Sequence, residues 1–158
     1  AYQFVSSTTF HQLRRQGRVL EWTRIHGACY GTPRTPVVQA LARGRDVVLS
    51  IDVQGARQVR RALHDQAVLI FLLPPSRAEL RARLEGRRTD SRAEIRRRLA
   101  MAQRELACAE WYDDVVVNDQ LDRATRIIEA IMTAKGSARR GGNTEPNTRS
   151  HDGTTYGA

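Results

Sequence analysis

The sequence is poor in the residues that build disulfide frameworks, metal sites and membrane spans. It has two cysteines in 158 residues, Cys29 and Cys108, whose spacing fits neither a disulfide framework nor a zinc site. The four histidines lack a second ligand at the i+3 or i+4 spacing of a helical metal site. No apolar run approaches the roughly 20 residues that cross a bilayer, and no secretory leader opens the chain. We therefore expect a cytoplasmic protein with no membrane partner and no metal ligand of its own.

Lysine is nearly absent, although the chain is strongly basic. There are 26 Lys plus Arg against 17 Asp plus Glu, a net charge of +9, and Lys135 is the only lysine. Nine arginines lie between Arg77 and Arg98 against four acidic residues, which suggests a polyanionic ligand. The alternative is a solvated helix face held by i,i+4 ion pairs. This stretch contains no aromatic residue, so we expect no nucleic acid partner.

Three apolar runs without alternation predict buried parallel strands at 47–52, 68–73 and 115–118. Ser76 to Glu79 and Ser91 to Glu94 both fit the capping box, so helices should begin near 77 and 92. The second of these helices should turn one apolar stripe to the sheet, composed of Ile95, Leu99, Ala102, Leu106 and Ala109. The helix after the last strand should have on its inner face Leu121, Ala124, Ile128 and Ile131. With a helix over 55–63, the order predicts an α/β fold with a parallel sheet flanked by helices.

The first 45 residues follow a different pattern. Short strands at 2–5 and 18–23 should surround a helix that Gly17 ends, and a further helix should run from Thr35 to Gly44. We therefore expect a small α+β unit in residues 1–45, a core of sheet and helices in 46–135 and a disordered polar tail in 136–158. Because the chain opens with Ala1 inside a strand-like segment, we also expect that residues precede it.

Six collinear motifs resemble those of the guanylate kinase family and together cover about residues 1 to 134. In chain order they are Tyr2-x-Phe4-Val5, Leu20-Glu21-Trp22 with Gly27-x-x-Tyr30-Gly31-Thr32, Leu49-x-Ile51-Asp52-x-Gln54-Gly55-Ala56, Leu73-Pro74-Pro75-Ser76, Leu84-Glu85-Gly86-Arg87 and Val117-Asn118-Asp119. The resemblance implies a P-loop nucleoside monophosphate kinase fold, with a GMP-binding insertion in residues 1–45 and a helical lid at about 76–98. It also implies phosphoryl transfer from ATP, the co-substrate, to GMP or dGMP with Mg²⁺ as cofactor, in purine metabolism.

One departure from this family concerns the loop that binds the ATP phosphates. The chain contains no G-x-x-x-x-G-K-[ST] loop to cradle them, which the resemblance places before residue 1. The strand that precedes that loop would lie between 47–52 and 68–73. We therefore expect the isolated chain to be inactive. An alternative is a guanylate-kinase-like interaction module without catalysis, which would not need Glu21, Tyr30 and the lid arginines that are present.

The resemblance implies roles for residues of the first unit. Glu21 would read the base, because one carboxylate can accept from two adjacent guanine N–H groups, a pattern that adenine does not offer. Tyr2 and Tyr30 would bind the GMP phosphate through their hydroxyls, and Thr32 would lie beside the guanine. Without the resemblance, Glu21 would be interpreted as a surface residue of a strand and the tyrosines as core or rim residues.

Further roles fall on the second unit. Asp52 would belong to the GMP site and order the ribose or magnesium-bound water from the end of a strand. The catalytic residues would be Arg87 and Arg98, which stabilise the charge of the transferring phosphoryl group. Asn118 would lie near the adenine of ATP. For Asp52 and Asn118 the alternative is an ordinary polar residue that terminates a strand.

Overall fold

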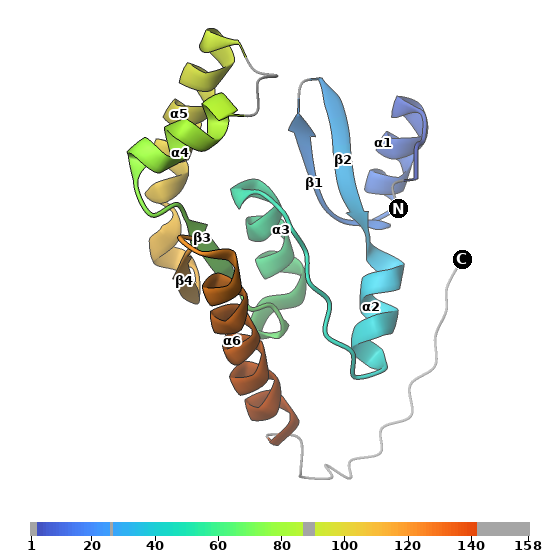
Figure 1. The fold of residues 1–158 in the computed structure, drawn as a ribbon. Helices are drawn as coiled ribbons and strands as arrows, with labels where there is room; N and C mark the ends of the chain where they lie inside the picture. The colour runs from blue at the N-terminus through green and yellow to red at the C-terminus, as the bar shows by residue number, and fades with distance from the viewer. Residues whose placement is uncertain (1–2, 26, 87–90, 142–158) are drawn as a thin grey trace, which may run out of the picture.

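The computed structural model describes residues 3–25, 27–86 and 91–141, with side chains to residue 136 (Figure 1). In this part of the chain the fold is mixed α/β, and helices dominate it. The elements are, in order, α1 (Ser7–Arg15), β1 (Val19–Ile25), β2 (Ala28–Pro33), α2 (Arg34–Ala42), α3 (Val53–Leu63), β3 (Ile70–Leu73), α4 (Arg77–Gly86), α5 (Arg92–Leu106), β4 (Asp114–Val117) and α6 (Leu121–Gly141). Single 3₁₀ turns follow α3 and α5. None of the described helices combines the length and apolarity of a bilayer-crossing segment.

The first unit is a helix followed by a hairpin. Ser6 caps α1 by accepting from the Thr9 N–H, and Gly17 (φ 68°) leaves the helix in the left-handed conformation that favours glycine. Strands β1 and β2 then pair antiparallel. The predicted strand at 18–23 is confirmed as β1, whereas β2 was not predicted. The strand predicted at 2–5 is wrong for residues 3–5, which form no strand because no neighbouring strand pairs with them in the described chain.

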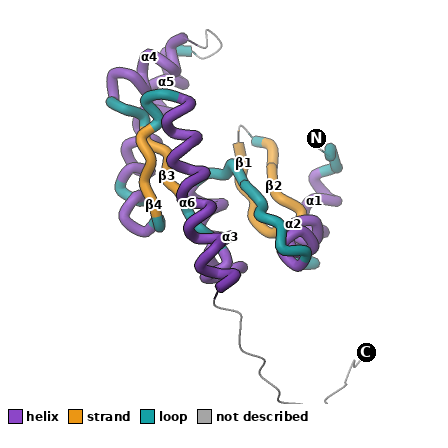
Figure 2. The backbone as a smooth tube through the Cα atoms, turned by 60° about the horizontal axis from the view of Figure 1, so that its bottom comes forward, coloured by secondary structure: helices purple, strands orange, loops and turns teal. Residues whose placement is uncertain are grey.

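Helix α3 lies between the hairpin and β3 and carries much of the core (Figures 1 and 2). Its buried positions Ala56 and Val59 are one turn apart, as an amphipathic helix requires. The buried core cluster consists of Leu20, Val37, Val59 and Ala67. Helix α2 occupies most of the predicted 35–44 span and contributes Val37 to this cluster.

Strands β3 and β4 pair in parallel, with Ile70 opposite Asp114 and Leu73 opposite Val117. The predicted strands at 68–73 and 115–118 are therefore confirmed within about two residues and in their parallel pairing. The expected burial on both faces is wrong, because Leu72, Val115 and Val117 are 50%, 49% and 44% exposed. The strand predicted at 47–52 is wrong, because this segment has no ladder partner in the part of the chain that the structure describes. Helix α6 packs on β4 and continues to Gly141, so the prediction of a disordered tail is wrong for 136–141. Residues 142–158 lie outside the described chain.

A charged clamp joins α3 to this parallel pair. The Arg60 guanidinium donates to the Asp113 carboxylate and, at 2.8 Å, to the carbonyl of Ala67. The Leu69 N–H donates to the same Asp113 oxygen at 2.6 Å. The end of α3 is thereby tied to the residues that enter both β3 and β4.

Both capping-box helices begin where the sequence predicts. Ser91 and Glu94 make the two reciprocal bonds, and Ser76 accepts from the Glu79 N–H at 3.0 Å. The stripe on α5 does not face the sheet as predicted. Its residues are at most half-buried because α5 packs on α4, and the two helices share a cavity lined by Leu80, Leu99, Ala102 and Leu106. Leu121 was also predicted to face inward, but it is 75% exposed at the first position of α6.

Candidate functional site

Four polar side chains share one face of the β1–β2 hairpin. The register places Glu21 opposite Thr32 and Thr23 opposite Tyr30. Opposed residues of an antiparallel pair lie on the same face, and so do residues two apart along a strand. The hairpin therefore presents a carboxylate, two threonine hydroxyls and a phenol within four adjoining positions.

Glu21 is the buried member of this group, with 5% of its surface exposed. The Thr32 hydroxyl donates to its Oε1 at 2.6 Å. Its Oε2 lies against the backbone of Gly55, so closely that a Cβ on Gly55 would be 2.6 Å away from it. Glutamate is rarely buried without a charged partner, because its carboxylate loses hydration. A carboxylate that accepts a hydrogen bond from the Thr32 hydroxyl still has lone pairs that can accept hydrogen bonds from a ligand.

Asp52 links the hairpin to the start of α3. Its Oδ1 accepts from the Gly55 N–H at 2.8 Å, which makes it the N-cap of α3, and its Oδ2 accepts from the Thr23 hydroxyl at 2.6 Å. The residue follows an extended, unpaired segment instead of the predicted strand. These two bonds hold the start of α3 against the polar face of the hairpin, beside Glu21 and Thr32.

Gln58 was not singled out from the sequence. Its side-chain amide makes a reciprocal pair with the backbone of Trp22: Nε2 donates to the carbonyl at 2.7 Å, and Oε1 accepts from the N–H at 3.2 Å. It thereby satisfies β1 as a neighbouring strand would. The available signal was its spacing, because Gln58 lies three residues after Gly55 and hence on the same face of α3.

Of the remaining predicted site residues, two lie away from the hairpin and two lie outside the described residues. Arg98 is half-buried on α5, and Asn118 follows β4. The Asn118 N–H donates to the Leu73 carbonyl, and its own carbonyl accepts from Arg83 at 3.0 Å. Arg98 and Asn118 thus belong to the half of the fold around β4, across α3 from the hairpin (Figure 1). Tyr2 and Arg87 lie outside the described residues.

Two other arginines of the basic stretch are engaged in ion pairs within α4. Arg81 contacts Glu85 and Arg83 contacts Glu79, both at i,i+4 spacing and largely exposed. The interpretation of this stretch as a solvated, ion-paired face therefore holds for these two residues.

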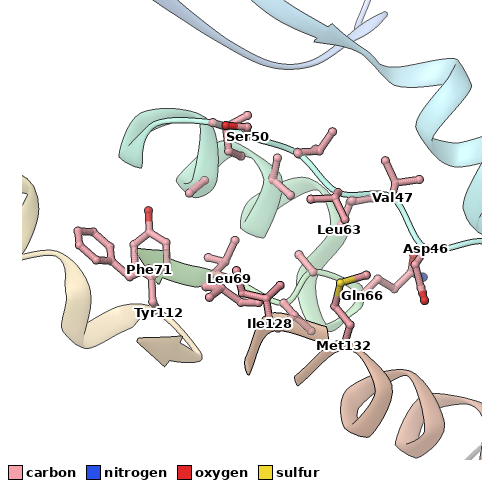
Figure 3. Close-up of a pocket in the computed structure, with 18 of the residues that line it drawn as sticks. Asp46, Val47, Ser50, Leu63, Gln66, Leu69, Phe71, Tyr112, Ile128 and Met132 are labelled. Carbon is pink, nitrogen blue, oxygen red and sulfur yellow. The ribbon is translucent and has the colours of Figure 1, made fainter. Parts of the chain in front are cut away.

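A cavity of about 490 Å³ begins beside Asp52 and extends along the inner side of α3 (Figure 3). Glu105 and Tyr112 line it, and neither was singled out from the sequence. Burial raises the pKa of the Glu105 carboxyl, and the negative charge of Asp52 raises it further. Burial also raises the pKa of the Tyr112 phenol, with Cys108 and the two carboxylates adding to the effect. Asp52 and Glu105 therefore place acidic groups in a cavity whose lining is mainly apolar.

Comparison with known proteins shows which family this chain belongs to. The family model described as guanylate kinase matches residues 1–135. The chain belongs to the guanylate kinase family. It is 52% identical over 133 residues to a guanylate kinase of Oleidesulfovibrio alaskensis, and 51% identical over 134 residues to one of Thermus thermophilus. These alignments cover 84% and 85% of the chain. The family resemblance inferred from the motifs is thus confirmed.

The fold agrees with this family. The structure matches the crystal structure of a guanylate kinase from Anaplasma phagocytophilum with a TM-score of 0.68 and 31% identity, over 85% of this chain and 65% of that one. The chain spans 64% and 60% of the lengths of the Oleidesulfovibrio and Thermus guanylate kinases. Its similarity therefore concerns a little under two thirds of these relatives.

Proposed function

We propose that the full-length protein to which this chain belongs transfers the terminal phosphoryl group of ATP to GMP or dGMP, giving ADP and GDP or dGDP. The observation that carries this proposal is the buried Glu21 carboxylate, held by Thr32 on the polar face of the hairpin. Family membership over residues 1–135 supports it. In this proposal, residues 1–45 bind GMP, residues 46–135 form the core of a P-loop kinase fold, and about 76–98 form its lid.

Glu21 would select guanine over other bases. Its oxygens accept from the ring N1–H and the exocyclic amino group, so that two parallel charge-assisted bonds form. Adenine presents an unprotonated N1 at the matching position and gives the buried carboxylate no donor from the base, which costs free energy. Thr32 would hold the carboxylate in place, and Tyr30 with Tyr2 would donate to the GMP phosphate.

The second half of the fold would act on the phosphates. Arg98 and Arg87 would neutralise the charge that spreads over the transferring phosphoryl oxygens. Asn118 would contact the adenine of ATP, and Asp52 would keep the ribose or a magnesium-bound water in place. Because the 158 residues contain no phosphate-cradling motif, we expect the chain on its own to be inactive.

The carboxylates present are compatible with Mg²⁺. No group of three His, Cys, Asp or Glu residues in the described ranges could hold a metal ion by itself. Mg²⁺ usually keeps several waters and binds one or two carboxylates together with substrate phosphates. Asp52 would hold a magnesium-bound water and not the ion itself, and the ion would neutralise phosphate charge near the cavity that Asp52 lines.

The experiment compares base selectivity in the full-length protein. Steady-state kinetics with GMP, dGMP, IMP and AMP would be measured for the wild type and for Glu21→Gln. Loss of a charge-assisted bond of about 1.5–3 kcal/mol should raise KM for GMP roughly 10- to 100-fold and narrow the preference over AMP. IMP lacks the exocyclic amino group and should be a poor substrate of the wild type.

Glu129→Gln is the matched control, because Glu129 is exposed on α6 far along the chain from the hairpin. It should leave every kinetic constant unchanged. An unaltered base preference in Glu21→Gln, with intact circular dichroism, would contradict the proposal.

A further inference from the structure

Strand β1 is irregular beside Glu21. Val19 lies opposite Pro33. Glu21, two positions further on, lies opposite Thr32, which is only one position back along β2. One residue of β1 therefore has no counterpart in β2, as in a β-bulge. A bulge interrupts the ladder and changes the direction of nearby side chains, so the ladder alone does not fix where the Glu21 carboxylate points.

The other edge of β1 is held by a side chain of α3. Among the described strands, β1 pairs only with β2, and α3 lies along its free side (Figure 1). The Gln58 amide donates to the Trp22 carbonyl at 2.7 Å and accepts from the Trp22 N–H at 3.2 Å. This N–H belongs to the peptide group between Glu21 and Trp22. The bond therefore restrains the backbone directly after Glu21.

The amide of Gln58 is itself fixed to α3. Its Nε2 also donates to the Gln54 carbonyl at 3.2 Å, one turn earlier in the helix. A side-chain amide has two N–H donors, and both are used within the protein. Gln58 therefore has no donor left for a ligand, so any effect on substrate must pass through the strand that it holds.

The ring of Trp22 is restrained from the opposite face of the hairpin. The Arg14 guanidinium of α1 lies 4.4 Å from the centroid of this ring. Successive side chains of a strand point to opposite faces, so the Trp22 ring and the Glu21 carboxylate lie on different sides of β1. With its ring held by α1 and its peptide groups held by α3, Trp22 resists a rotation that would tilt Glu21.

The position of the strand matters because α3 also meets the carboxylate. Gly55 lies on the same face of α3 as Gln58, and a Cβ there would be 2.6 Å from Oε2 of Glu21. A shift of β1 along or away from α3 would change this approach. A misplacement of about 1 Å at a binding group can reduce the rate about 100-fold.

We propose that Gln58 is a positioning residue for base recognition. By bonding both peptide groups of Trp22, it sets the direction in which the Glu21 carboxylate meets the guanine. This inference rests on the proposed function, because it assigns Gln58 a role that acts through Glu21.

The test uses Gln58→Met in the full-length protein, because methionine has a similar length but cannot make the two bonds. KM for GMP should rise about tenfold and the preference over AMP should narrow, while kcat and KM for ATP stay within about twofold of the wild type. Partial unfolding alone would lower kcat and leave both KM values and the base preference unchanged. Gln39→Met is the matched control, because it makes the same replacement at an exposed position of α2. It should keep all the wild-type constants.

A double variant tests whether Gln58 acts through Glu21. In Glu21→Gln with Gln58→Met, KM for GMP should exceed that of Glu21→Gln alone by no more than about twofold, because the carboxylate to be positioned is already gone. Multiplication of the two single effects would overturn the inference. Gln58→Glu serves if Gln58→Met does not fold. Its carboxylate cannot donate to the Trp22 carbonyl when ionised, so KM for GMP should rise here as well.

The outcomes separate this inference from the proposed function. If Glu21→Gln loses base preference while Gln58→Met or Gln58→Glu folds and keeps the wild-type KM for GMP, the inference is overturned and the proposed function stands. If Glu21→Gln also keeps its base preference, the proposed function fails together with the inference.

Discussion

Gly55 is the residue on which the position of the Glu21 carboxylate depends. An added Cβ would lie 2.6 Å from Oε2 of Glu21 and 3.2 Å from the Cβ of Ile51, so Gly55→Ala must displace one of them. The carboxylate is the more easily moved of the two. In the full-length protein we expect KM for GMP to rise on the order of tenfold in Gly55→Ala, with a smaller change in kcat.

The control for this substitution is Glu129→Ala on α6. The Glu129 side chain is exposed, and alanine is a good helix former. We expect this variant to keep the wild-type KM and its fold. If both variants keep the wild-type KM, the guanine is not read at Glu21 Oε2.

Part of this site could be predicted from single residues. Glu21, Tyr30 and Thr32 stood out because their residue types fit a nucleotide and their motifs resemble a family. Gly55 and Gln58 did not, because their roles depend on contacts across 34 and 36 positions of the chain. The spacing of residues within α3 carries no information about which strand will pack on it.

Among the elements, the clamp that joins α3 to β3 and β4 should depend on pH. Burial tends to raise the pKa of Asp113, but the bonds from the Leu69 N–H and the Arg60 guanidinium outweigh it and lower this pKa below its ordinary value. A carboxylate with a lowered pKa stabilises the fold at pH values above its unfolded pKa. That contribution is lost as the pH falls through the folded pKa.

The titration midpoint of Asp113 can be measured at the Leu69 amide, which donates to its carboxylate. We expect the Leu69 amide proton shift to titrate in NMR spectra with a midpoint below the ordinary aspartate value of 3.8. In Asp113→Asn the Leu69 shift should not titrate, and the fold should lose about 1–3 kcal/mol through the unsatisfied partners. A midpoint at or above 3.8 in the wild type would show that the clamp does not form.

Elements that depend on a few consecutive residues were predicted better than elements that depend on pairing with a distant segment. Helices α4 and α5 begin at their capping serines, because a capping box involves only four consecutive residues. The segment 47–52 has the aliphatic composition of a buried strand, but a strand also needs a partner, which composition cannot supply. The α5 stripe was correctly predicted as apolar, but its partner is α4 and not the sheet.

For the whole molecule, the decisive feature is that the strands within the described ranges form two separate two-stranded sheets. Two-stranded sheets are marginally stable alone, and the cavity beside β3 leaves apolar side chains there incompletely packed. We expect the isolated chain to be aggregation-prone or partly molten, with helical far-ultraviolet dichroism but no cooperative thermal transition. Differential scanning calorimetry with analytical ultracentrifugation tests this. A sharp transition from a monomer would contradict it.

The two sheets also differ in how far apart their partners lie along the chain. Glu21 and Thr32 of the hairpin are 11 positions apart, whereas Leu69 and Asp113, which lead into the parallel pair, are 44 apart. Closing the longer loop costs more chain entropy, and hairpins form within about 1–10 μs. We therefore expect the hairpin that carries Glu21 to form early in folding. The parallel pair should follow later, after α3 has docked.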